Sequence, residues 1–212
     1  MVRIIALVLT AVMVCACAPG KVLRMTASGK IVCSDNDYKD SDVFDGSTDD
    51  DCGFGLIGRI GHGIPFTETQ DADGPVGSTR PNNTMEFELG YLRQGDTEFD
   101  GLYQGTPDEG TIEADGLVLG LVYTRRISDK FDLFANYGIF DWEVEEEEEF
   151  GGIPESHDAS GSSPYYGFGG RYWFMPKVSL RLGWNRFTDV GKSSETGKGD
   201  IDNWSLGVDY LF

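Results

Sequence analysis

The sequence predicts an all-β fold: an eight-stranded antiparallel transmembrane β-barrel with long acidic extracellular loops. Most of the 212-residue chain alternates apolar with polar residues, the period-two pattern of strands whose two faces meet different surroundings. The polar positions hold charged residues and many of the 29 glycines, and the apolar positions hold large aromatics towards the strand ends. A barrel with lipid outside and small or charged side chains inside has this pattern. No run of 18 apolar residues occurs, which excludes a bundle of membrane-spanning helices.

Each expected strand sets an apolar face against a polar one. In the last strand, Trp204, Leu206 and Val208 alternate with Ser205 and Gly207. Six segments show the alternation clearly, namely 84–94, 112–125, 131–142, 163–174, 178–187 and 203–212. Two more strands are expected over 53–64 and 21–33, the second partly because an even number of strands is usual in such barrels. Alternation alone leaves a soluble barrel with the apolar face inside as an alternative.

The lengths of the connectors favour the membrane barrel. Short connectors at 126–130 and 175–177 are typical of periplasmic turns, and long polar connectors are typical of extracellular loops. The connector 65–83 is long and departs from this rule. The segments that we expect to form the extracellular loops are 34–52, 95–110, 145–162 and 188–199.

Acidic residues dominate the charge of the chain. The sequence has 36 Asp+Glu against 17 Lys+Arg, a formal net charge of −19. Eight of the acids lie in 34–52, five in 95–110 and seven in 145–162, so the charge concentrates in the expected loops. Binding of nucleic acid needs clustered Lys and Arg, so we expect no nucleic-acid partner.

Residues 1–18 are similar to an export signal, which leaves 19–212 as the barrel domain. Arg3 supplies the positive start, and the apolar stretch 4–14 is too short to span a bilayer. Two ways of processing stay open. Ala-Cys-Ala at 16–18 is similar to a cleavage site, and Val-Cys-Ala-Cys at 14–17 is similar to a lipoprotein box in which Cys17 would be lipidated.

Export predicts a disulfide between Cys33 and Cys52. The two cysteines flank an acidic segment in an oxidising compartment, where disulfides persist. A bridge closing a loop of about 20 residues stabilises a fold by roughly 3 kcal/mol on the chain-entropy model. Two free thiols are the alternative. His62 and His157 have no ligand spacing to the cysteines, so we expect neither a metal site nor a cofactor.

Three other motifs are weaker candidates for sites. Gly-Phe-Gly-Leu-Ile-Gly at 53–58 matches a dinucleotide-binding fingerprint, but an acidic loop precedes it and no helix is expected after it. His157 next to Ser156 gives the hypothesis of a lipid-modifying enzyme, although neighbours in a loop are not a preformed nucleophile and base. The glutamates 145–149 form no complete calcium-loop pattern. We therefore expect no catalytic residue.

The chain resembles the small outer-membrane β-barrels of the OmpA transmembrane-domain, OmpX and Opa type. Phe-Glu-Leu-Gly-Tyr at 87–91 looks like the third strand of that family, and Ser-Leu-Arg-Leu at 179–182 looks like its seventh. The end of the chain looks like the signal that the outer-membrane assembly machinery reads, with alternating apolar residues before a terminal aromatic. These residues are Trp204, Leu206, Val208, Tyr210 and Phe212.

The resemblance implies a barrel with a plugged lumen. In OmpA-type barrels an inward Glu of the third strand pairs with an inward Arg of the seventh, and the matching positions are Glu88 and Arg181. An eight-stranded barrel is just wide enough for its own side chains to fill. From the inward-facing positions we expect a network of buried charges comprising Glu86, Glu88, Arg59, Arg171 and Arg181.

The expected function follows from this fold. We expect a non-enzymatic protein of the bacterial outer membrane that serves envelope structure or surface interaction. We expect it to bind neither nucleic acid nor a cofactor. Its expected partners are outer-membrane lipid, lipopolysaccharide and the assembly machinery, and we expect a monomer. We expect the peptidoglycan-binding domain of longer relatives to be absent, since the sequence ends at Phe212. A narrow porin and a lipid-modifying enzyme are the alternatives.

Overall fold

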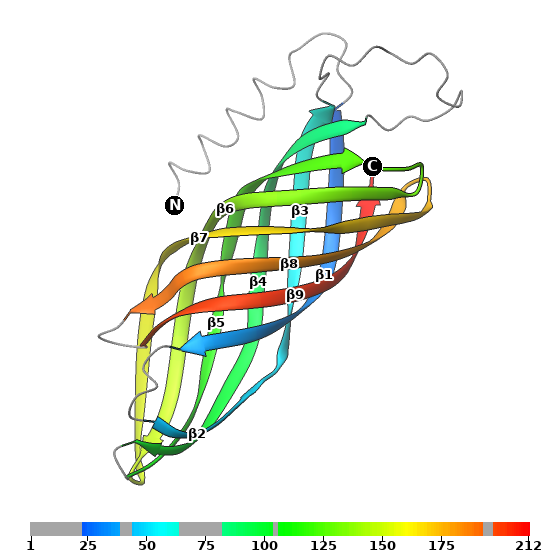
Figure 1. The fold of residues 1–212 in the computed structure, drawn as a ribbon. Helices are drawn as coiled ribbons and strands as arrows, with labels where there is room; N and C mark the ends of the chain where they lie inside the picture. The colour runs from blue at the N-terminus through cyan, green and yellow to red at the C-terminus, as the bar shows by residue number, and fades with distance from the viewer. Residues whose placement is uncertain (1–22, 39–43, 64–81, 104–105, 193–196) are drawn as a thin grey trace, which may run out of the picture.

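The computed structural model describes residues 23–38, 44–63, 82–103, 106–192 and 197–212 (Figure 1). The expected export signal, Cys17 and nearly all of the connector 65–83 lie outside the described residues. No described helix is long and apolar enough to cross a membrane.

The described residues form nine strands in one antiparallel sheet. The strands are β1 (Leu23–Tyr38), β2 (Phe44–Asp50), β3 (Cys52–Gly63), β4 (Asn83–Tyr103), β5 (Thr106–Arg126), β6 (Phe131–Phe150), β7 (Ile153–Met175), β8 (Val178–Lys192) and β9 (Gly197–Leu211). Strands β2 and β3 both pair with β4 and are separated only by Asp51. Because β4 also pairs with β5, eight positions close into a ring in the order β4-β3-β1-β9-β8-β7-β6-β5. The predicted eight-stranded barrel is confirmed, including its first strand.

The outer face of the ring is apolar and the inner face is mostly polar. Along β6, Leu133, Tyr137 and Ile139 are exposed, whereas Asn136 and Phe140, on the opposite face, are buried. Other strands follow the same alternation, so large apolar side chains cover the outside of the molecule. This arrangement suits contact with lipid and contradicts the alternative of a soluble barrel with an apolar interior.

The two ends of the barrel differ. At the turn end, short connections at 127–130 and 176–177 join neighbouring strands, and Phe212 donates its backbone N–H to the carbonyl of Met25. At the opposite, extended end, β4 to β7 project beyond the ends of β8 and β9 (Figure 1). These strands are 20 to 23 residues long, about twice the 9–11 residues that span a bilayer.

The expected loops are mostly paired strand, which corrects the sequence prediction. Pairing of β4 with β5 continues to Tyr103 and Thr106, and pairing of β6 with β7 continues to Phe150 and Ile153. Residues of 34–52 and 188–199 also belong largely to strands. Pairing satisfies the backbone donors and acceptors of these segments, but both of their faces are largely polar, so they carry no sustained apolar alternation that would reveal them.

We call this projecting part the extended sheet. It comprises β2 together with residues 96–103, 106–114, 144–150 and 153–162 of β4 to β7. Strand β7 pairs with β8 only as far as Tyr165 and Phe187. Beyond that point the described part of β8 pairs with β9 alone, past a bulge where Asp189 has a φ of 60°.

Candidate functional site

An ion pair between adjacent strands lies at the centre of the lumen. Arg59 on β3 faces Glu88 on β4 directly in the register, and their Nε and Oε2 atoms are 2.6 Å apart. The other oxygen of Glu88 accepts a hydrogen bond of 2.9 Å from the hydroxyl of Tyr165 on β7. Because β4 and β7 are not neighbours in the ring, this contact crosses the lumen.

Asp209 on β9 joins this ion pair to the other side of the ring. Its Oδ1 lies 3.5 Å from Nη1 of Arg59 and accepts a hydrogen bond from the Ser28 hydroxyl on β1. Its Oδ2 lies 2.7 Å from Nε of Arg171 on β7. Asp209 therefore contacts two arginines, and all of these side chains are buried. The alternation of the last strand places Asp209 on the inward face, which is the sequence signal that would have added it to the predicted network.

The remaining predicted charges occupy the same lumen but make other contacts. Glu86 is fully buried, and its Oε2 lies 4.0 Å from Nη2 of Arg171. The guanidinium carbon of Arg181 lies 3.4 Å from the centre of the Phe134 ring, a cation–π contact. The structure therefore places all five predicted residues inside the ring.

The pairing of Glu88 differs from the family-based expectation. Glu88 forms its ion pair with Arg59, not with Arg181. The register explains the difference, because Arg59 and Glu88 occupy directly opposite positions on neighbouring strands, whereas β4 and β8 lie apart in the ring. Arg181 instead packs its charge against an aromatic face.

A row of amides lies across the lumen beside the charges. Asn136 donates to Asn185 at 2.8 Å, Asn185 donates to Asn203 at 3.3 Å, and Asn203 donates to Gln94 at 2.9 Å. The hydroxyl of Ser34 donates to the same Gln94 side-chain oxygen at 3.1 Å. The row links five strands through side chains that the sequence analysis did not single out.

An apolar layer fills the lumen towards the extended end. Three of its rings are in mutual contact: the Phe187 centre lies 4.9 Å from that of Phe140 and 5.3 Å from that of Tyr165. The layer also includes Val32, Leu92, Val118, Trp142, Val144 and Ile201. The expected network of charges is thus accompanied by an apolar layer that the sequence did not predict.

Two glycines make room for Tyr165. A Cβ atom on Gly120 would overlap the Tyr165 hydroxyl, and one on Gly138 would lie 2.7 Å from a ring carbon of the same tyrosine. Any other residue at Gly120 would press on the ring that bonds Glu88, and one at Gly138 would meet both that ring and the backbone carbonyl of Leu119. The inward glycines of β5 and β6 therefore position a lumen contact.

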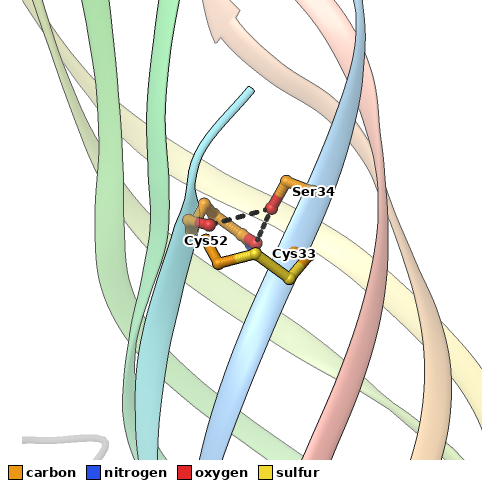
Figure 2. Close-up of a disulfide and its surroundings, with 4 residues drawn as sticks. Cys33, Ser34 and Cys52 are labelled. Atoms are coloured by element: carbon orange, nitrogen blue, oxygen red, sulfur yellow. Dashed lines mark hydrogen bonds between the residues drawn. A yellow bond between two sulfur atoms is a disulfide. The ribbon is translucent and has the colours of Figure 1, made fainter. Parts of the chain in front are cut away.

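The predicted disulfide is present. Cys33 on β1 faces Cys52 on β3, with their Cα atoms 4.2 Å apart, and the bridge lies on the outer face of the barrel (Figure 2). The next residue, Ser34, points inward to Gln94. The bridge joins the two strands where the segment 34–51 begins and ends.

Carboxylates form rows across the outer face of the extended sheet. In one row Asp96, Glu113, Glu145 and Asp158 are successive cross-strand partners on β4 to β7. Like charges directly opposite one another destabilise a sheet. Arg93 offsets part of this repulsion, because its Nη2 lies 3.1 Å from Asp96 and 2.8 Å from Glu113.

A second row has no such cation among its cross-strand partners. Asp100 faces Glu109, and Glu109 faces Glu149. A hollow of about 890 Å³ lies against this part of the sheet. Its lining includes Glu98, Asp100, Glu109, Glu147, Glu148 and Glu155.

The structure separates the residues of the enzyme hypothesis. Ser156 and His157 are neighbours on β7, so their side chains point to opposite faces of the sheet. His157 instead contacts two glutamates: its Nε2 lies 3.4 Å from Oε1 of Glu148 and 3.6 Å from Oε2 of Glu155. Sequence spacing did not reveal this cluster, because Glu148 belongs to the preceding strand.

Comparison with known proteins is consistent with this architecture. A family model described as the outer membrane protein beta-barrel domain matches residues 4–212. Outer membrane protein A of Escherichia coli O157:H7 is 28% identical over 156 residues, which are 73% of this chain and 43% of that protein. Outer membrane protein A of Klebsiella pneumoniae is 27% identical over 166 residues, which are 76% of this chain and 47% of that protein. The chain thus spans less than half the length of these curated relatives.

Among solved structures, the chain is similar to Ail, the attachment invasion locus protein of Yersinia pestis. That crystal structure is 16% identical, covers 89% of this chain and 98% of Ail, and has a TM-score of 0.51. Ail in complex with the heparin analogue sucrose octasulfate is 14% identical, covers 90% and 99%, and also has a TM-score of 0.51. At these identities the similarity shows a shared fold and nothing further.

Proposed function

The chain belongs to the outer-membrane β-barrel family, which implies that it is located in the bacterial outer membrane, and from this premise we propose a non-enzymatic role in envelope structure or surface interaction. One observation carries the proposal: side chains from opposite sides of the ring meet across the lumen. Tyr165 on β7 reaches Glu88 on β4, and Asp209 links Arg59 on β3 to Arg171 on β7. With the apolar layer stacked beside this network, the barrel acts as an anchor and not as a channel.

Planar bilayer recordings test this proposal. We expect no steady openings from the purified protein, because the charges, amides and apolar rings fill an eight-stranded lumen. Arg59→Ala and Phe187→Ala, each removing a large side chain from one layer, serve as matched comparisons. Steady ohmic openings of the unaltered protein would contradict the plug and favour the narrow porin.

The orientation of the barrel forms part of the proposal. We place the turn end in the periplasm and the extended sheet outside the cell, since barrels of this class have short periplasmic turns and longer extracellular segments. Protease added to intact cells should cleave a tag inserted at Gly151, at the tip of the β6–β7 hairpin, and should spare a tag inserted at Asp129. The reverse pattern would contradict this orientation.

The extended sheet is the surface that we propose for interaction. Its rows of carboxylates attract a cationic partner and repel a polyanion such as the heparin analogue bound by Ail. Binding of polylysine and of heparin to whole cells, compared between the parent and the Glu109→Gln/Glu149→Gln variant, tests this. We expect polylysine binding to be salt-sensitive and to weaken in the variant. Heparin binding by the parent that is stronger than its polylysine binding would contradict the proposal.

The last strand is proposed as the assembly signal. Trp204, Leu206, Val208, Tyr210 and Phe212 are all exposed on the outer face of the barrel. Lipid and lipopolysaccharide are the proposed partners of the apolar outer face, and the assembly machinery is the proposed partner of this strand. Deletion of Phe212 should lower the amount of heat-modifiable protein in the outer membrane. Phe174→Ala, which removes another exposed phenylalanine from β7, should not.

A further inference from the structure

Three potential metal ligands converge near the tip of the β6–β7 hairpin. Glu148 and Glu155 are directly opposite in the register, and His157 lies two residues after Glu155 on the same face of β7. One ligand atom from each residue lies within 4.8 Å of the other two. The three come from two paired strands, so the sheet geometry holds them together.

The distances suit a small divalent ion. Ligands at about 2.0–2.2 Å around a tetrahedral ion lie roughly 3.4 Å from one another. The imidazole Nε2 lies 3.4 Å from one carboxylate oxygen and 3.6 Å from the other. The two carboxylates contribute ligand atoms within 4.8 Å of each other, so three ligands can surround one ion with small side-chain movements.

The ligand chemistry distinguishes this cluster from the rest of the acidic sheet. The rows on the outer face offer carboxylate oxygens that suit any cation weakly, whereas this cluster adds an imidazole nitrogen. Imidazole with carboxylates favours zinc and neighbouring transition metals over calcium and magnesium, which prefer oxygen ligands alone. We propose that Glu148, Glu155 and His157 bind a divalent transition-metal ion of the zinc type.

The position of the site gives bound metal a structural effect. Glu148 and Glu155 line the hollow against the extended sheet, so an ion can reach them from solvent. Both carboxylates are otherwise opposed like charges, and a metal ion would convert their repulsion into a cross-strand link. Occupation of the site therefore tightens the end of a hairpin whose β7 edge has no β8 partner in the described structure.

Zinc titration of the purified protein tests the proposal. Competition with a chromophoric chelator at pH 7.5 should show one high-affinity Zn²⁺ per chain in the parent. His157→Ala and Glu148→Gln should each weaken that binding by more than about tenfold, a loss that even an outer partner of a zinc ligand produces. Glu147→Gln and Glu149→Gln, on the same strand but the opposite face, are matched controls and should bind as the parent does.

A spectroscopic measurement separates metal binding from a simple ion pair. The chain has two histidines, so the imidazole signal that disappears in His157→Ala identifies His157. That signal should shift on addition of Zn²⁺ and broaden with Co²⁺, and an equal concentration of Ca²⁺ should not prevent it. An unmoved His157 signal would overturn the proposal, as would equal Zn²⁺ affinity of the parent and His157→Ala, because His157 would then only pair with the two carboxylates.

Discussion

Replacing Arg59 by methionine isolates the contribution of the central lumen contact. Methionine keeps much of the length of the side chain and removes its charge, which leaves Glu88 buried with a hydrogen bond from the Tyr165 hydroxyl but without its ion pair. Asp209 retains Arg171 at 2.7 Å, so the main loss falls on Glu88. Breaking a buried ion pair by removing one partner costs about 3–5 kcal/mol.

The free energy of unfolding should therefore fall by about that amount in Arg59→Met. Urea unfolding of the protein refolded in lipid vesicles measures it, followed by the fluorescence of the four tryptophans and by gel mobility without boiling. Adding Glu88→Gln to Arg59→Met should recover part of the loss, with a coupling of at least about 1 kcal/mol, because the unpaired charge is then gone.

Arg181→Met is the matched comparison. Arg181 stacks on Phe134, whereas Glu88 forms its ion pair with Arg59, so replacement of Arg181 should cost less, about 1–2 kcal/mol. If Arg181→Met destabilised the barrel more than Arg59→Met, or if Arg59→Met unfolded at the same urea concentration as the parent, Arg181 would be the true partner of Glu88 and the reasoning would fail.

Three further changes test other contacts. Replacing both Cys33 and Cys52 by serine should lower the free energy of unfolding by about 2–4 kcal/mol, measured by urea unfolding, and a reductant should then have no further effect on the variant. Gly120→Ala should cost about 1–3 kcal/mol because the new methyl group overlaps the Tyr165 hydroxyl, and an equal cost in a Tyr165→Phe background would contradict that explanation. Glu149→Lys should turn the Glu109–Glu149 repulsion into an attraction worth about 0.2–1 kcal/mol, and so slow hydrogen exchange of the amides that pair β5 with β6. Glu143→Lys makes the same kind of change opposite Asp115, nearer the barrel, and controls for the position of the effect along the strands.

The sequence by itself determined the membrane barrel, because the alternation of a strand is a local property. Every second residue of a strand faces the same way, so Leu133 and Tyr137 on one side, and Asn136 on the other, can be assigned without any knowledge of neighbouring strands. The same rule placed Glu86, Glu88 and Arg171 inside the ring. Cysteine number and the export prediction similarly sufficed for the Cys33–Cys52 bridge.

Tertiary structure decided which inward residues meet. The pairing of Glu88 with Arg59 follows from the register of β3 on β4, and the contact of Tyr165 with Glu88 follows from closure of the ring. The extended sheet escaped prediction because strands with two polar faces have no apolar period. His157 lies beside Glu148 only because β6 and β7 pair beyond the barrel. Alternation reflects the environment of each strand face and is visible in a short stretch of sequence. Strand register and closure of the ring bring together residues that are far apart in the chain, and no local sequence pattern reveals them.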